Sequence, residues 1–257
     1  MIAIMKPSLV TAAVVVIGNE ILSGRTKDAN LVYLAEHLNE LGIRLLEARI
    51  VADVEDAIVQ AVNDCRTRFH YVFTTGGIGP THDDITAASI AKAFAVPLTA
   101  HPEAVARLER HYAHGQLNEA RMRMAYTPEG ATLIDNPISA APGFQIGNVF
   151  VMAGVPLIMQ AMFAGIRHRL VGGAPLRSRT FRTNLAEGIM AKDLAALQAR
   201  YADVEIGSYP SFARREPGVR IVLRSTDAAR LAAVGEDFMA MVVGLGGQTE
   251  EIEVADR

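Results

Sequence analysis

The chain has 257 residues, of which 50% are hydrophobic and 21% are charged, proportions typical of a globular protein with a substantial core. This composition excludes a wholly disordered chain, and the length predicts about one to two domains. With 25 basic and 28 acidic side chains the net charge is −3, so we expect neither nucleic acid nor an anionic membrane surface as a partner.

Cys65 is the only cysteine, which excludes an internal disulfide and a cysteine-based zinc site. A single cysteine fits a reducing compartment, and we expect a cytoplasmic protein. No apolar stretch reaches the roughly 18 to 20 residues that a membrane helix needs. The apolar residues 9–17 lack a clean small-x-small cleavage site, so we interpret them as a buried strand rather than a signal peptide.

Strand and helix patterns alternate in the first part of the chain, an order that predicts a mostly parallel sheet with helices on both faces. Such sheets bind ligands beyond the carboxyl ends of their strands. The predicted elements are strand 12–17, a helix from residue 28 or 29 to just before Gly42, strand 43–51, a helix that Asp53 can cap, strand 71–74 and helix 86–96.

Further along, residues 101–124 look helical and highly charged, residues 131–134 and 148–152 look like the last strands, and Pro156 begins a helix to about Leu170. Residues 172–175, Gly-Gly-Ala-Pro, form the strongest linker signal in the chain. We therefore expect two domains, residues 1–171 and 176–246.

The second domain has the pattern of a small α+β unit with no chemical constellation. We expect residues 248–257 to be an acidic, frayed end. The predicted elements of this domain are strand 178–185, helix 191–199, strands 204–209 and 219–224, and helix 228–243.

The richest segment is the loop 75–86, Thr-Gly-Gly-Ile-Gly-Pro-Thr-His-Asp-Asp-Ile-Thr, which follows a predicted strand and precedes a predicted helix. Its three glycines leave backbone amides uncovered, so the loop can wrap an anion such as phosphate against the positive end of the next helix. The spacing lacks the third glycine of the dinucleotide-binding fingerprint and the Gly-Lys-Ser/Thr of the P-loop, which excludes both motifs.

The sequence allows two interpretations of Asp83 and Asp84. Carboxylates at a helix start commonly cap free amides and favour the helix dipole. One carboxylate suffices for a cap, however, and a second one beside a phosphate would repel the ligand unless a cation lies between them. Mg²⁺ typically joins one or two carboxylates to phosphate oxygens. His82 could ligate a softer metal, donate to phosphate, or simply be solvated.

Three more polar residues follow predicted strands at the same edge of the sheet. Glu20 either caps a short helix or faces the ligand, Asn30 could cap a helix, and Asp53 looks like a cap after the second strand. All three lie beyond carboxyl ends of strands, where doubly wound folds place their sites.

Taken in order along residues 11–170, these motifs resemble the molybdopterin-binding domain family of molybdenum-cofactor biosynthesis. The resemblance is closest to the branch of competence/damage-inducible protein A and the corresponding half of FAD synthase. The second domain resembles the small KH-like middle domain of the competence protein by element order alone. The matching segments are Gly18-Asn19-Glu20-Ile21-Leu22, Asp28-Ala29-Asn30, Asp53, the loop 75–86, Ala141-Pro142-Gly143 and Gly154-Val155-Pro156.

The resemblance implies a three-layer α/β/α fold whose glycine loop holds a phosphorylated pterin or a dinucleotide. Members near this branch are associated with metal-dependent cleavage of the pyrophosphate in ADP-ribose or FAD. The family aspartates map onto Asp53 and Asp84, with Asp83 beside the latter.

Three departures from the family pattern matter. His82 stands where competence proteins usually have Glu, and Leu157-Ile158 replace a glutamate of both relatives. Full-length competence proteins carry a nicotinamide-mononucleotide deamidase domain after this region, and we expect no deamidase activity from residues 1–257.

The leading hypothesis is a hydrolase that cleaves a nucleotide pyrophosphate with a divalent metal, either Mg²⁺ or a transition metal such as Mn²⁺, Co²⁺ or Ni²⁺. Asp83 and Asp84 would hold the metal, and Asp53 would orient the metal or water. The ligand-binding set is Glu20, Asn30, Gly76, Gly77, Gly79, Thr81 and His82.

The alternatives are non-hydrolytic molybdopterin binding or a step of cofactor assembly, and a regulatory protein with a degenerate site. We also expect a homo-oligomer, because the family commonly assembles and the apolar stretch 152–162 exceeds what one small helix needs.

Overall fold

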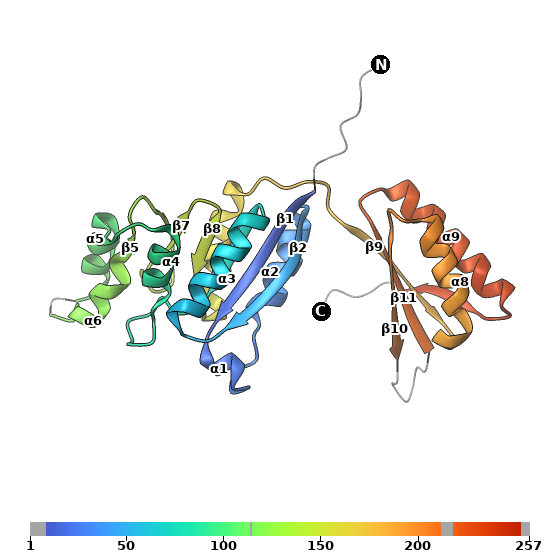
Figure 1. Cartoon of the computed structure of the whole chain (residues 1–257), viewed down its shortest axis with the longest axis horizontal. Helices are drawn as coiled ribbons and strands as arrows, with labels where there is room; N and C mark the ends of the chain where they lie inside the picture. The colour runs from blue at the N-terminus through green and yellow to red at the C-terminus, as the bar shows by residue number, and fades with distance from the viewer. Residues whose placement is uncertain (1–8, 114, 212–217, 253–257) are drawn as a thin grey trace, which may run out of the picture. The chain divides into compact units, whose positions relative to one another are not determined.

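The computed structural model describes residues 9–113, 115–211 and 218–252. The chain divides into two compact units between Gly173 and Ala174. Each unit has its own sheet, as the ribbon in Figure 1 shows, and its own buried core.

The first unit contains a six-stranded sheet in the order β2-β1-β3-β8-β7-β6. Only β7 runs against its neighbours, so the sheet is mixed but mostly parallel, as predicted. Its central strands are β-branched and aromatic runs buried on both faces, which suits strands covered by helices on either side. The strands are β1 Val10–Ile17, β2 Ile43–Val51, β3 Tyr71–Thr75, β6 Thr132–Ile134, β7 Gly143–Ile146 and β8 Val149–Met152.

Helices cover both faces of this sheet, which confirms the three-layer arrangement. Helices α2 (Asn30–Glu40) and α7 (Pro156–Ile166) pack on one face through Leu34, Leu38 and Phe163. Helices α3 (Glu55–Arg68) and α4 (Thr86–Phe94) pack on the other. The smaller elements of the unit are α1 Asn19–Leu22, β4 Leu98–Ala100, α5 Pro102–His111, α6 Glu119–Met122, the 3-10 turns Arg123–Ala125 and Arg167–Arg169, and β5 Tyr126–Pro128.

The parallel strands end together at one edge of the sheet. Thr75 of β3 pairs with Val16 of β1 and with Met152 of β8, and Ile17 pairs with Val51 of β2. The loops that follow these four strands therefore meet at this edge. It is the edge at which the candidate residues were expected.

The second unit is a four-stranded antiparallel sheet, β10-β11-β9-β12, with two helices whose apolar residues join one cluster with Phe181 and Ile221. Its predicted helices and first three strands are all present. Its elements are β9 Arg177–Thr183, α8 Glu187–Arg200, β10 Glu205–Ser211, β11 Gly218–Ser225, α9 Ala228–Gly244 and β12 Thr249–Ile252.

The expectation of a frayed end is wrong for β12, which pairs with β9 from Thr249 to Ile252. The acidic residues there are not merely solvated. Glu251 accepts hydrogen bonds from Arg179 at 2.8 and 2.7 Å, and this ion pair holds the pKa of its carboxyl below the ordinary value. Residues 253–257 lie outside the described residues.

Residues 101–124 do not form one helix. Helix α5 ends at His111, Tyr112 is extended, and Gly115 has a φ of +80°, so the helical path stops before α6 begins. Strands β4, β5 and β7 were not predicted from the sequence either, since each has only three or four residues.

The apolar stretch 152–162 is largely used inside its own unit. Met152, Met159 and Met162 are fully buried, whereas Leu157 is 66% exposed. The apolar excess that suggested an oligomer is therefore smaller than the sequence indicated, and self-association stays a prediction. None of the described helices combines the length and the apolar character that crossing a bilayer requires.

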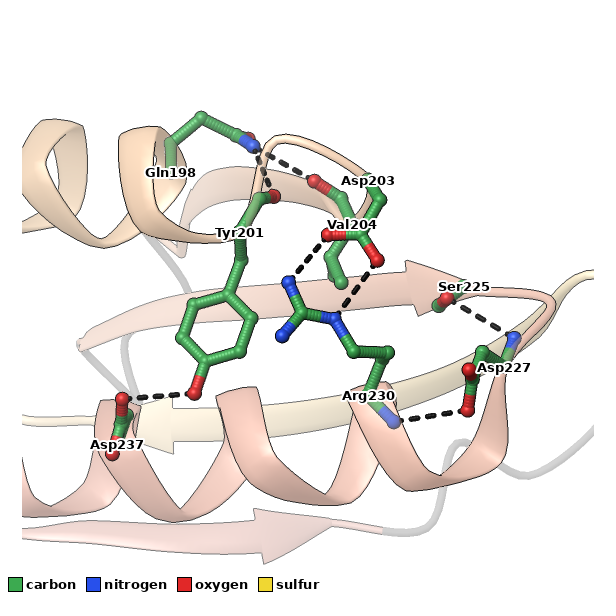
Figure 2. A network of polar contacts seen from close by, with 8 residues as sticks. All are labelled: Gln198, Tyr201, Asp203, Val204, Ser225, Asp227, Arg230 and Asp237. Carbon is green, nitrogen blue, oxygen red and sulfur yellow. Dashed lines mark hydrogen bonds and ion pairs between the residues drawn. The ribbon is translucent and has the colours of Figure 1, made fainter.

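A polar network fastens the end of α8 to the start of α9 (Figure 2). The Arg230 guanidinium donates to both carboxylate oxygens of Asp203, at 2.9 and 2.6 Å, and the Tyr201 hydroxyl donates to Asp237 at 2.9 Å. Asp227 caps α9, because its Oδ1 accepts from the amides of Ala229 at 2.8 Å and Arg230 at 3.1 Å.

Replacing this cap tests its contribution. Asp227→Ala leaves two amides at the start of α9 without their acceptor, so we expect the free energy of unfolding of the second unit to fall by about 1 kcal/mol. Urea unfolding followed by circular dichroism measures it. Asp227→Asn is the matched control, since asparagine caps comparably, and an equal loss in both variants would contradict the capping role.

Candidate functional site

A cleft of about 530 Å³ opens at the carboxyl edge of the first unit's sheet. We call it the loop cleft. The loop residues 76–81 and 83–84 line one side of it, and Glu20, Asn136, Ser139 and residues 153–156 line the others. The structure thus brings the segments after β1, β3 and β8 together around one space.

Two glycines make the tight start of the loop possible. Gly76 has a φ of +104° and Gly77 a φ of +66°, which other residues rarely adopt. A Cβ on Gly76 would lie 2.1 Å from the carbonyl oxygen of Ile17, and one on Gly77 would lie 2.2 Å from the Thr86 hydroxyl oxygen. Only glycine fits at either position.

The loop's amides are not all available to a ligand. The Gly76 amide donates to the Met152 carbonyl at 3.1 Å and so extends the sheet instead of facing an anion. The amides of Gly77, Ile78 and Gly79 have no acceptor among the described residues. These three residues line the loop cleft, so their amides are available to a phosphate there.

Thr86 fixes the loop to α4. Its buried hydroxyl donates to the Gly76 carbonyl at 2.9 Å, and its amide donates to the Gly77 carbonyl at 3.0 Å. The start of α4 is thereby held by the loop's own carbonyls, and the loop cannot move away from the helix without breaking both bonds.

The capping interpretation of Asp83 and Asp84 is wrong, because α4 begins at Thr86 with no side-chain cap. Both carboxylates instead converge on Thr81. Asp84 Oδ2 accepts from the Thr81 amide at 2.8 Å, and the Thr81 hydroxyl lies 2.5 Å from Asp83 Oδ1 and 2.6 Å from Asp84 Oδ2. A hydroxyl has one proton, so it can donate to only one of the two carboxylates at a time.

The surroundings of Asp83 favour its charged form. The Thr81 hydroxyl lowers the pKa of Asp83, and the Asp83 amide and the nearby His82 ring act in the same direction. Two converging carboxylates, one exposed and one half-buried, fit a hard divalent cation. No group of three or more His, Cys, Asp or Glu side chains within the described ranges could hold a metal alone, so ligand oxygens and water would complete its coordination.

Asp53 does not cap α3, contrary to its sequence interpretation, because that helix follows Val54 with no side-chain cap. Its Oδ2 instead accepts from the Asn19 amide at 2.8 Å, which ties the turn after β1 to the turn after β2. Asp53 does not line the loop cleft, whereas Glu20 on the turn that it supports does.

Asn30 is the first residue of α2 and not its cap, since the Asp28 carboxylate accepts from the Leu31 amide at 2.8 Å. Asn30 is only 3% exposed, and its Nδ2 donates to the Gly154 carbonyl at 2.8 Å. It therefore supports Gly154 in the wall of the loop cleft, and its Oδ1 is buried with no hydrogen-bond partner among the described residues, so its role toward a ligand stays a prediction.

Two further observations were not anticipated. Asn136 is buried, and its side chain holds the 136–141 turn by accepting from the Ser139 amide at 3.1 Å and donating to the Ala141 carbonyl at 2.9 Å. The Asn-Pro pair at 136–137 was the available signal for this turn. His82 does not line the loop cleft and lies with Asp84 along a second cleft of about 370 Å³.

Comparison with known proteins gives two family matches. Residues 13–171 match the family described as a probable molybdopterin binding domain, and residues 175–245 match the FAD synthase middle domain.

Individual relatives span both units. A CinA-like protein of Salinibacter ruber is 32% identical over 98% of this chain, and a protein named a probable FAD synthase of Caenorhabditis briggsae is 29% identical over 91%. The chain spans 64% and 50% of those two relatives. A crystal structure of the protein CinA with unknown function from Thermoplasma acidophilum is 31% identical, with a TM-score of 0.60 over 63% of this chain and 98% of that one.

The close approach of Gly76 to the Ile17 carbonyl gives a prediction about stability. Gly76→Ala places a methyl group against the Ile17 backbone, which cannot rotate away, so we expect a loss of at least about 2 kcal/mol in the free energy of unfolding. Gly24→Ala is the matched control, because Gly24 also has a positive φ, +71°, with nothing within 4 Å of its Cβ position.

The control should lose only the left-handed backbone cost of about 1 kcal/mol. Thermal and urea unfolding of both variants measure the difference. Equal losses would show that the close approach of Ile17 is not what requires glycine at position 76.

Proposed function

The chain belongs to the molybdopterin-binding domain family, with a FAD synthase middle domain after it, and from this membership we propose that it is a metal-dependent hydrolase of a nucleotide pyrophosphate such as ADP-ribose or FAD. The observation that carries the proposal is the pair Asp83 and Asp84. Both carboxylates converge on Thr81 instead of capping α4, beside three unoccupied amides.

In this proposal the amides of Gly77, Ile78 and Gly79 bind one phosphate of the substrate, as backbone amides beside a helix start commonly do. Asp83 and Asp84 hold the metal, Mg²⁺ or one of Mn²⁺, Co²⁺ and Ni²⁺, on the same side of the loop. When bound, the divalent metal supplies positive charge to the pyrophosphate oxygens and acidifies the attacking water.

Thr81, Asp53 and Asn30 have positioning roles in this proposal. Thr81 holds the two carboxylates together through its amide and hydroxyl. Asp53 acts through the Asn19 amide and thereby places Glu20 at the margin of the loop cleft. Asn30 donates to the carbonyl of Gly154 and so holds this residue in the wall of the loop cleft.

A second candidate is molybdopterin binding without hydrolysis. It is favoured by the description of the matching family and by Leu157-Ile158, which stand where the resemblance expects a glutamate. The same amides would then bind the phosphate of the pterin. A degenerate regulatory site is the third possibility that the missing carboxylate allows.

A paired assay separates these functions. The protein is incubated with ADP-ribose and with FAD under each of the four metals, and AMP release is followed by chromatography. Release that EDTA abolishes supports the hydrolase. If no metal yields AMP and molybdopterin binds at micromolar concentration, the binding function replaces it. If the protein neither hydrolyses nor binds any of these ligands, the result supports a regulatory protein with a degenerate site.

Removing one carboxylate charge tests the metal site. Asp84→Asn keeps an oxygen that can accept from Thr81 but removes the anionic charge that a hard cation needs. We expect at least about a 100-fold loss of metal-dependent hydrolysis with unchanged melting in EDTA. Asp56→Asn, at an exposed carboxylate of α3 that pairs with Lys92 at 3.2 Å, is the control. Full activity of Asp84→Asn at limiting metal would remove Asp84 from the metal site.

The Thr81 hydroxyl gives a pH prediction. Because it lowers the pKa of Asp83, the carboxylate stays ionised to lower pH, and metal binding is lost only as the pH falls through that lowered value. Thr81→Val should therefore move this loss of Mn²⁺ affinity to higher pH, and Thr81→Ser should restore it. Calorimetric titration with Mn²⁺ between acidic and neutral pH measures the shift, and superimposable profiles for the three proteins would refute it.

A further inference from the structure

Asp84 stands between two clefts. Beyond the loop cleft it also lines the second one, which we call the α4 cleft, together with His82 from the loop and with Ala87 and Ala88 from the first turn of α4. The far wall of the α4 cleft comes from the segment 119–126, which includes Arg123 and Tyr126. Its volume of about 370 Å³ lies in the range of small-molecule sites.

Three of the residues that line the α4 cleft are suited to an anion. The amides of Ala87 and Ala88 lie in the first turn of the nine-residue helix α4 and have no acceptor among the described residues. The Arg123 guanidinium, which lines the same cleft, makes no ion pair or hydrogen bond within the described part of the chain. A cation without a partner beside a helix start is a favourable arrangement for phosphate.

Other residues of the same lining are suited to a flat ring. Tyr126 of β5 is 40% exposed and Leu98 of β4 is 37% exposed, although both are large hydrophobic residues. They lie on paired strands, since Ala100 pairs with Tyr126 and Leu98 with Pro128, and Met122 completes the apolar wall. Nucleobases stack on exposed aromatic rings of this kind. Glu119 at the rim offers an acceptor for sugar hydroxyls.

The two groups of free amides are linked through one hydrogen bond. The Gly77 carbonyl accepts from the Thr86 amide at 3.0 Å, so the loop that carries the amides of Gly77, Ile78 and Gly79 is bonded to the start of the helix that carries those of Ala87 and Ala88. Asp84 borders both clefts at this position. A pyrophosphate has two linked phosphates, which matches two adjacent anion sites separated by a metal-binding carboxylate.

We propose that the α4 cleft binds the nucleoside monophosphate half of a dinucleotide, with its base on Tyr126 and its phosphate at Arg123 and the start of α4. The pyrophosphate that is cleaved then lies beside Asp84, between the two clefts, and the other half of the substrate occupies the loop cleft. This inference rests on the proposed function for the identity of the substrate, but the α4 cleft can be tested without turnover.

The test is calorimetric titration with AMP, and separately with adenosine, in EDTA. Tyr126→Ala should weaken AMP binding by about tenfold or more, and Tyr126→Phe should restore it, because the ring and not the hydroxyl does the stacking. Tyr209→Ala removes a comparably exposed strand tyrosine, 46% exposed, from the second unit and is the matched control. Arg123→Gln should weaken AMP about tenfold and leave adenosine within about twofold, since only AMP carries the phosphate.

Two results would overturn the inference: no AMP binding by the wild-type protein at millimolar concentration, or AMP binding by Tyr126→Ala equal to that of Tyr209→Ala. Failure of the proposed function looks different, because AMP then binds in a Tyr126-dependent way while no metal supports hydrolysis of ADP-ribose or FAD. Near-wild-type melting of every variant confirms that the binding losses are local.

Discussion

The crossing of three chain segments at Gly76 is the constraint on which the whole site depends. The residue continues β3, donates its amide to the Met152 carbonyl at the end of β8, and passes so close to Ile17 at the end of β1 that a Cβ would meet its carbonyl oxygen at 2.1 Å. Gly154 approaches from the β8 side, where its own Cβ would lie 3.2 Å from the Gly76 Cα. Glycine at both positions lets the ends of neighbouring strands approach closely enough to form one cleft.

The loop that begins at Gly76 also explains why Asp83 and Asp84 are not needed to cap helix α4. A helix start normally has amides in need of acceptors, and an aspartate placed there is usually used for that purpose. Here the Gly77 carbonyl accepts from Thr86, and the Thr86 hydroxyl is turned back to Gly76. The first helical amide is thus bonded to the loop, and Asp83 and Asp84 line the loop cleft with the Thr81 hydroxyl between them.

The sequence predicted correctly those strands and helices whose hydrophobic pattern is compatible with only one type of secondary structure. Buried β-branched runs such as 12–17, separated by helical periodicity, predicted the parallel sheet and its helices correctly. Short strands such as β7 were missed because four residues carry too little periodicity. Strand β12 was missed because it pairs with β9, which lies far away in the sequence: Arg179 of β9 is 72 residues from its partner Glu251.

Side-chain roles were harder to predict than elements, for a physical reason. A carboxylate just before a helix can accept from that helix or from a remote amide, and local sequence does not distinguish the two. Asp53 looked like a cap, yet it accepts from the amide of Asn19, the first residue of α1. Asn30 looked like a ligand or a cap, yet it is buried against Gly154. The composition of the glycine loop predicted a cradle for phosphate, and that role stays a prediction; which of its amides are free could be known only from the hydrogen bonds of its neighbours.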